Sequence, residues 1–179
     1  MPDTQFIADR EIYEKVLLGE VPYAKDFLWL ATADIKDLHV DDRGEMVPFL
    51  QVLSRLIGDG VSVRLLHARE PGPRFREDFD RFPNLIEELE RILCPRVHFK
   101  CVIVDGRFAY SGSANLTGAG MGAKSGNRRN FESGFVTTDA DVISAVMAQF
   151  DEIWMGERCA ECDRKEHCAS YPEMMPGDE

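Results

Sequence analysis

Residues 97–115 read VHFKCVIVDGRFAYSGSAN, and they predict two β-strands joined by a tight turn. Side chains alternate between the two faces of a strand, so His98 and Lys100 fall on the same face. The Asp105-Gly106 pair is a strong signal for a hairpin turn, which returns the second strand antiparallel to the first. The stretch therefore predicts a strand pair that carries an imidazole and an amine on one face.

The second strand adds hydrogen-bonding groups to that face. Ser113 and Asn115 share a parity, so both can converge on the face that carries His98 and Lys100. A nucleophilic imidazole, a fixed cation and two neutral hydrogen-bonding groups suit the binding of a phosphate and the stabilisation of a phosphorane-like transition state. Asp105 has the wrong parity for direct catalysis, and we expect it to support the turn and the residues behind the site.

The spacing of these residues resembles a known motif. The pattern is HxKxxxxDxxxxxxGSxN, and its fixed positions are His98, Lys100, Asp105, Gly112, Ser113 and Asn115. It resembles the HKD motif of the phospholipase D superfamily, with no departure at a fixed position. Glu132, in the segment NFESGF, stands where family members carry a glutamate in a later strand. The resemblance extends over residues from about 5 to 155, and it implies an α/β/α sandwich with a mixed sheet.

The resemblance also implies a role for each residue of the site. His98 would attack phosphorus and form a covalent phosphohistidine, while Lys100 and Asn115 hold the non-bridging oxygens. Ser113 and Glu132 would lie behind them, and the glutamate would fix the tautomer of the histidine, as carboxylates orient catalytic imidazoles elsewhere. This chemistry requires no catalytic metal.

The implied mechanism uses two histidines, one as nucleophile and one as general acid for the leaving oxygen. The HxK pattern occurs once, and His39, His67 and His167 have no lysine two residues later. Short superfamily members with one motif assemble as two-fold dimers that place both motifs at one interface. We therefore expect a symmetric homodimer.

The composition favours a single soluble domain. The chain has 179 residues, 44% of them hydrophobic, which is enough for one globular core. Its formal net charge of −11 argues against nonspecific coating of nucleic acid or anionic membranes, although a local basic patch can override the mean field. The sequence contains no signal-like amino terminus and no membrane-spanning apolar run, so we expect a cytoplasmic protein.

The remaining sequence predicts alternating strands and helices. Apolar runs at 27–35 and 61–67 are of strand length, and helical spacing between them predicts a right-handed crossover with parallel strands. Further helices are expected around residues 12–17, 85–93 and 142–154, a short strand at 131–138, a loop at 41–44, and a polar excursion or flap at 69–83.

A glycine-rich loop follows the motif. Residues 116–130 read LTGAGMGAKSGNRRN and include Lys124, Arg128 and Arg129. These side chains are candidate phosphate contacts of a nucleic-acid groove. A solvated loop without a binding role is the alternative.

Three of the five cysteines are clustered near the carboxyl end, as Cys159-x2-Cys162-x5-Cys168. A CxxC pair places two thiolates on one turn, as structural metal sites require. The spacing resembles the trio that, with a distant fourth cysteine, holds a [4Fe-4S] cluster in some RecB-type nucleases. Cys94 is the candidate fourth ligand; His167 is a zinc-style alternative, but its adjacency to Cys168 makes joint ligation awkward. Free thiols or a disulfide are the other interpretations.

We therefore predict a catalytic domain over residues 1–156 and a cysteine-containing tail or metal knuckle over 157–179. The expected function is that of a homodimeric phosphodiesterase that acts through a phosphohistidine on DNA or RNA. The alternatives are a phospholipase that acts on lipid headgroups and a non-catalytic, dimeric nucleic-acid-binding module.

Overall fold

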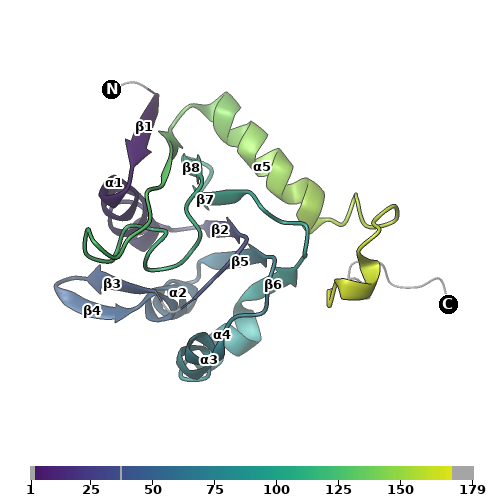
Figure 1. Cartoon of the computed structure of the whole chain (residues 1–179), viewed down its shortest axis with the longest axis horizontal. Helices are drawn as coiled ribbons and strands as arrows, with labels where there is room; N and C mark the ends of the chain where they lie inside the picture. Colours follow the sequence, from purple (N-terminus) through teal and green to yellow (C-terminus); the bar gives the residue numbers. More distant parts are fainter. Residues whose placement is uncertain (1–2, 37, 171–179) are drawn as a thin grey trace.

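A mixed seven-stranded sheet forms the centre of the molecule (Figure 1). The computed structural model describes residues 3–36 and 38–170. The strand order is β1-β9-β8-β7-β2-β5-β6, and β3 and β4 form a separate hairpin. The strands are β1 (Thr4–Ala8), β2 (Phe27–Thr32), β3 (His39–Asp42), β4 (Glu45–Pro48), β5 (Ser62–His67), β6 (Glu90–Leu93), β7 (Lys100–Val104), β8 (Phe108–Gly112) and β9 (Ser133–Thr137).

The strand pairing confirms both features that the sequence predicted for the sheet. β2 and β5 run parallel and are connected through α2 (Phe49–Gly58), which is the expected crossover. β7 and β8 pair antiparallel, with Lys100 opposite Gly112, and the turn between them has positive φ at Asp105 and Gly106. β7 also pairs antiparallel with β2, so the motif hairpin lies in the middle of the sheet.

Helices cover both faces of the sheet, which confirms the α/β/α sandwich (Figure 1). Leu28 and Leu30 of β2 pack in one core with α2, while Trp29 and Ala31 face the other core beneath α5 (Ala140–Trp154). Asp139 caps α5, because its carboxylate accepts hydrogen bonds from two N–H groups of the first turn. The remaining helices are α1 (Arg10–Ile12), the π-helix η1 (Tyr13–Leu18), η2 (Val21–Tyr23), α3 (Pro73–Phe79), α4 (Pro83–Glu88) and η3 (Lys165–His167).

Three local predictions were wrong, and one strand was not predicted. In the predicted loop at 41–44, Asp41 and Asp42 belong to β3, and only residues 43 and 44 form the turn of the β3–β4 hairpin. Gly44 N–H donates to the Asp41 carboxylate, and α2 begins at Phe49. The helix predicted at 85–93 ends at Glu88, and Ile92 lies in β6. The predicted flap at 69–83 contains the helix α3. The strand that was not predicted is β1.

The predicted tail leaves the end of α5 and folds back beside β6 (Figure 1). Residues 171–179 of that tail lie outside the described residues. None of the helices in the described part of the chain combines the length and apolarity that a membrane span requires.

Candidate active site

The imidazole and the amine of the motif meet where β7 begins. β7 begins at Lys100, so His98 lies two residues before the strand and not within it, where the alternation predicted it. His98 is exposed to solvent, whereas the Lys100 side chain is buried, with 6% of the residue exposed. Lys100 Nζ donates a hydrogen bond of 2.6 Å to the carbonyl oxygen of His98 and lies 3.3 Å from its Nδ1. The structure therefore places a solvent-accessible imidazole beside an ammonium group that a backbone carbonyl oxygen holds in place.

Burial lowers the pKa of Lys100, and the negative charge of Glu132 acts in the opposite direction. A partly desolvated ammonium attracts an anion more strongly than a solvated one, because water competes less for it. The position therefore suits contact with a phosphate oxygen.

Asn115 is fixed by the end of β2. Its Oδ1 accepts hydrogen bonds from Thr32 Oγ1 at 3.2 Å, Ala33 N at 3.2 Å and Asp34 N at 3.1 Å. These contacts occupy the oxygen of the amide, and within residues 3–36 and 38–170 its Nδ2 has no hydrogen-bond partner. The two N–H groups of Asn115 are thus available to an oxygen of a substrate.

Ser113 and Glu132 form a hydrogen-bonded pair. Ser113 Oγ donates to Glu132 Oε2 and accepts from the backbone N–H of Ser133 at 3.1 Å. Asn130 Nδ2 donates to Glu132 Oε1 at 3.1 Å, and the backbone N–H of Glu132 donates to Asp9 Oδ1 at 3.0 Å. The carboxylate is therefore held on both oxygens.

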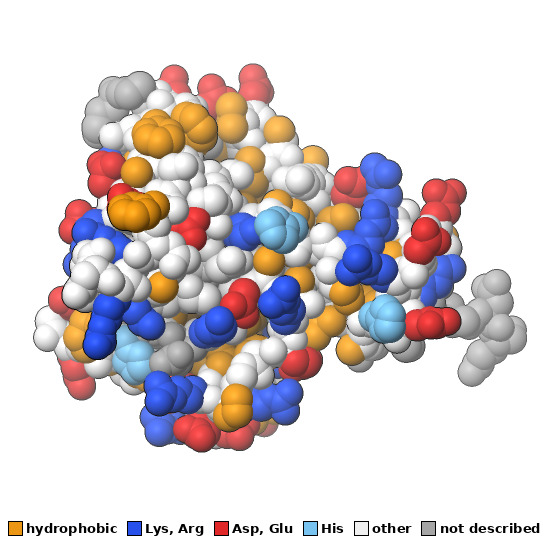
Figure 2. Space-filling model, in the orientation of Figure 1, with side chains coloured by type: hydrophobic (Ala, Val, Ile, Leu, Met, Phe, Trp, Pro, Cys, Tyr) orange, Lys and Arg blue, Asp and Glu red, His pale blue; other side chains and the backbone are white. Residues whose placement is uncertain are grey.

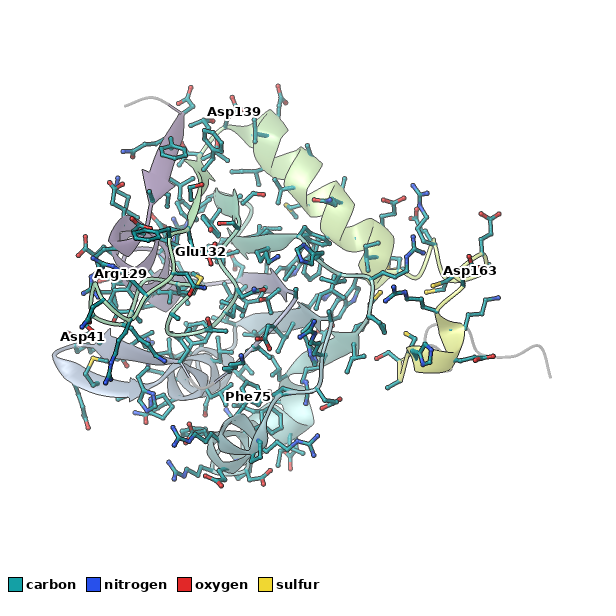
Figure 3. All side chains as sticks on the ribbon, in the orientation of Figure 1. Asp41, Phe75, Arg129, Glu132, Asp139 and Asp163 are labelled. Atoms are coloured by element: carbon teal, nitrogen blue, oxygen red, sulfur yellow. The ribbon has the colours of Figure 1, made fainter. Side chains whose placement is uncertain are left out.

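The resemblance also implied a contact between Glu132 and the histidine of the motif. Among the described residues, no hydrogen bond joins Glu132 to His98 of the same chain. Its role in fixing the histidine tautomer stays a prediction. Glu132 and Arg129 both come from the segment between β8 and β9 (Figure 3).

Asp105 supports the turn between β7 and β8, as its strand parity predicted. Its carboxylate accepts hydrogen bonds from the backbone N–H groups of Lys25, Asp26 and Phe27, at 3.0, 2.9 and 3.0 Å. Burial raises the pKa of Asp105, but these three N–H groups and the nearby Arg107 outweigh it, so the pKa is lowered. Asp105 thus ties the turn to the start of β2.

Gly112 is required by packing. A Cβ at this position would collide with the hydroxyl of Tyr110 and the carbonyl oxygen of Ser133. Gly134 is its partner on the neighbouring strand β9. The Tyr110 ring fills the space that the two glycines leave, and burial raises the pKa of this phenol to about 12. The glycine of the motif therefore lets β8 and β9 approach closely beside Ser113.

The predicted phosphate contacts lie on a compact loop. Backbone hydrogen bonds of 3.0 Å tie Lys124 N to Gly118 O and Asn130 N to Ala119 O. Lys124 and Arg128 are exposed and Arg129 is half-buried. None of the three cations forms an ion pair with an acidic side chain in the described ranges. Lys and Arg side chains are spread across this face of the molecule (Figure 2).

Sequence reasoning missed several residues that support the site. Thr32 orients Asn115 and also accepts from Leu116 N at 3.0 Å, and Asp9 and Asn130 hold Glu132. These residues lie far apart in the chain or have no fixed spacing to the motif. Only a clustering of polar residues at strand ends could have indicated them.

The other histidines have different surroundings. His67 is fully buried at the end of β5, where Nδ1 lies 2.8 Å from Arg69 O and Nε2 lies 3.3 Å from Arg91 Nη2; burial lowers its pKa. His39 and His167 are exposed in β3 and η3. The structure therefore assigns His67 to the core.

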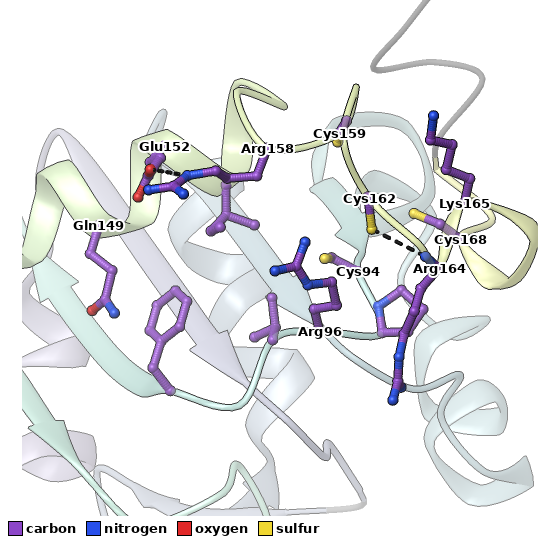
Figure 4. A pocket seen from close by; sticks show the side chains of 14 residues that line it. Cys94, Arg96, Gln149, Glu152, Arg158, Cys159, Cys162, Arg164, Lys165 and Cys168 are labelled. Carbon is purple, nitrogen blue, oxygen red and sulfur yellow. Dashed lines mark hydrogen bonds and ion pairs between the residues drawn. The ribbon is translucent and has the colours of Figure 1, made fainter.

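All four predicted metal ligands line one pocket. Cys94 directly follows β6, and the tail supplies the remaining three (Figure 4). The fifth cysteine, Cys101, is buried in the sheet, and burial raises the pKa of its thiol to about 12.

Comparison with known proteins agrees with the geometry. No curated protein matches the chain significantly. Nuc, a phospholipase D family member from Salmonella typhimurium, matches with a TM-score of 0.62 at 18% identity, over 86% of this chain and 95% of that one. The archaeal chromatin protein TrmBL2, whose structure shows a mode of DNA binding, matches with a TM-score of 0.56 at 16% identity, over 86% and 53%. Phosphatidylserine synthase from Haemophilus influenzae matches with a TM-score of 0.59 at 16% identity, over 86% and 39%.

The family of the chain follows from a match over most of its length. The family described as "Cardiolipin synthase, PLD-like domain" matches residues 18–154, a range that contains the complete motif and Glu132. Members of this superfamily are phosphodiesterases. The chain belongs to the phospholipase D-like family.

Proposed function

We propose that the chain cleaves phosphodiester bonds of nucleic acid through a phosphohistidine, at an active site shared by two copies of the chain. The observation that carries this proposal is the exposed His98 beside the buried Lys100, with Nζ and Nδ1 3.3 Å apart. Asn115 adds two available N–H groups from a side chain that β2 locks in place. Together these groups bind a phosphate oxygen and present a nucleophile to phosphorus.

The reaction has two steps in this proposal. Because Nδ1 of His98 faces Lys100, Nε2 is the nitrogen that attacks phosphorus; an N–P bond forms and the bond to the leaving oxygen breaks. The second histidine gives its proton to the leaving oxygen. Water then attacks phosphorus, the same histidine takes a proton from that water, and the N–P bond breaks. Lys100 and Asn115 stabilise the negative charge throughout, so the steps require no catalytic metal.

Two observations support a second copy as the source of the second histidine. The chain contains one HxK pattern, and His67 is enclosed in the core. In addition, Phe131 is 95% exposed immediately before Glu132, and Phe6 and Phe135 are 58% and 53% exposed with ring centroids 5.6 Å apart. Apolar side chains lie exposed on the side of the molecule that carries β1 (Figure 2). Such a patch beside the site suits a symmetric contact.

The basic loop favours nucleic acid as the substrate. Lys124, Arg128 and Arg129 lie between Asn115 and Glu132 in the chain and form no ion pair with a described acidic side chain. Unneutralised cations along a surface attract a polyanionic backbone, even when the chain has a net charge of −11. TrmBL2, which shares the fold, binds DNA. The match to phosphatidylserine synthase makes lipid the second candidate substrate.

The decisive experiment measures cleavage of plasmid, single-stranded DNA and RNA in excess EDTA. The wild type and the control variant His39→Ala, which changes an exposed histidine outside the motif, should cleave at similar rates. His98→Ala should lose about 10³-fold or more of the rate, since it removes the nucleophile.

The other outcomes separate the alternatives. Undiminished cleavage by His98→Ala would refute the proposed nucleophile. Release of headgroups from phosphatidylcholine without cleavage of nucleic acid would identify a phospholipase. Retention of nucleic acid without turnover of any diester would identify a binding module.

A further inference from the structure

Four cysteines from two distant parts of the chain surround one pocket of about 180 Å³. Cys94 lies directly after β6, whereas Cys159, Cys162 and Cys168 belong to the tail beyond α5. The close-up shows the four sulfur atoms around the same opening (Figure 4). Each of the four cysteines is partly exposed. The fold thus brings together side chains that are more than 60 positions apart in the sequence.

The tail docks on the sheet near Cys94, at Leu93 of β6. The backbone N–H of Leu93 donates to Ser170 Oγ at 2.9 Å, and Cys168 Sγ donates to Leu93 O at 3.3 Å. Residues 157–170 read ERCAECDRKEHCAS, so alanine and cysteine are their only apolar residues. Such a segment cannot be ordered by burial of apolar surface, and small segments of this kind are commonly held by a metal.

The surroundings of the pocket suit a negatively charged centre. The backbone N–H of Arg164 donates to Cys162 Sγ at 3.4 Å, and the Arg96 side chain lines the same pocket. A divalent ion with four thiolates has a net charge of about −2, which N–H donors and nearby cations offset. The cationic side chains that line the pocket are Arg96, Arg158, Arg164 and Lys165.

We propose that Cys94, Cys159, Cys162 and Cys168 form a structural metal site that clamps the tail onto β6. A zinc ion and an iron–sulfur cluster share this ligand set of four thiolates. Within the described ranges, no three His, Cys, Asp or Glu side chains are yet arranged to hold an ion. Binding therefore requires rotation of cysteine side chains, in which Cys168 leaves Leu93 O, and the four thiols release their protons to solvent.

The proposed site is connected to the catalytic histidine by a short turn. The backbone N–H of Cys94 donates to His67 O at 2.9 Å, and that of Val97 donates to Cys94 O at 3.0 Å. His98 follows Val97 directly. A metal bond to Cys94 would therefore immobilise the turn that delivers His98 to β7.

The test measures metal content in the untagged full-length protein. One preparation comes from cells grown with added zinc. The other comes from cells grown with added iron and is purified without oxygen. We expect about one zinc ion per chain, or about four iron atoms with equal sulfide and a broad visible absorption from thiolate-to-iron charge transfer. The double variant Cys159→Ser/Cys162→Ser should lose the metal. The matched control Cys101→Ala, which removes the thiol buried in the sheet, should retain it.

A second measurement covers the case in which the double variant does not fold. A chelator is used to extract metal from the wild type, and trypsin cleavage in the tail, at Arg158, Arg164 or Lys165, is followed with time. Extraction should accelerate cleavage there while circular dichroism of the domain is preserved. Absence of zinc and iron from both preparations, equal metal loss in Cys101→Ala, or a disulfide among the four cysteines would overturn the proposal. None of these results depends on whether the protein cleaves diesters.

Discussion

Lys100 combines burial with a positive charge. Its place on a strand was predicted from the alternation, but the start of β7 at Lys100 and the burial of this side chain were not. Burial depends on how the neighbouring strands flank β7. The hydrogen bond to His98 O fixes the ammonium without neutralising it. The side chain therefore remains a cation that water reaches poorly.

As the pH rises, we predict that activity is lost at a lower pH than it would be if Lys100 were exposed to solvent. Burial lowers the pKa of Lys100, and the ammonium is lost as the pH rises through that lowered value. The alkaline limb of the kcat/KM profile should reflect this loss, and in Lys100→Arg it should move to higher pH because arginine stays charged. Identical alkaline limbs for the two proteins, each normalised to its maximum, would contradict the assignment.

Asp105 acts on stability, since its carboxylate accepts three backbone N–H groups of residues 25–27. Its side chain is 7% exposed. We predict that Asp105→Ala lowers the free energy of unfolding by about 1–3 kcal/mol, because the partners lose their acceptor in a buried place. Denaturant unfolding at neutral pH measures the change, and Asp59→Ala, at a 65% exposed side chain, should change it by less than about 0.5 kcal/mol.

The contribution of Asp105 to the free energy of unfolding should depend on pH. The pKa of Asp105 is lower in the folded chain than in the unfolded one, so its contribution is complete above the unfolded pKa. It is lost as the pH falls through the folded pKa. The difference between wild type and Asp105→Ala should therefore shrink in acid, and a constant difference would rule out the ionised carboxylate as its cause.

Elements with strong local signals were predicted well, and those set by distant partners were not. The β7–β8 hairpin follows from alternation and from Asp105-Gly106, and α5 follows from its periodicity. Ile92 continues the helical spacing of Leu85, yet it pairs with Leu66 of β5 in the sheet. A short apolar run is compatible with either structure, and the neighbouring strand decides between them.

The loop between β8 and β9 should carry much of the salt dependence of nucleic-acid binding. Each phosphate contact releases counterions, so removal of three cations should lower the slope of log affinity against log salt by about 2. Binding of single-stranded DNA by His98→Ala measures this without cleavage. The variants, all in that background, are Lys124→Ala/Arg128→Ala/Arg129→Ala and, as a control of equal charge, Lys15→Ala/Arg76→Ala/Arg81→Ala. Equal slopes for the two triple variants would exclude the loop as the binding surface.

One chain of this family contains half of the histidines that the proposed reaction uses. The motif predicts the residues of the candidate site from the sequence, and the single HxK pattern is the reason that we propose a partner subunit. Contacts across a two-fold axis have no sequence signature of their own. The exposed Phe131, Phe135 and Phe6 became visible as one surface only in the folded chain.

Subunit mixing tests the shared site. Wild type and His98→Ala are mixed in equal amounts and allowed to exchange. If both histidines are required, only wild-type pairs are active, so about one quarter of the activity of an all-wild-type sample should remain, instead of about one half for independent chains. A mixture with His39→Ala should keep full activity. Retention of half the activity after verified exchange would contradict a shared site.

The single motif also restricts how the sequence of such a protein can evolve. In a symmetric pair, the nucleophile and the acid are the same residue of the same gene, so every substitution near His98 alters both roles at once. The environment of the imidazole must then be a compromise between basicity for attack and acidity for proton donation. Duplication and fusion of the gene would remove this constraint, because each half could then adapt to one role.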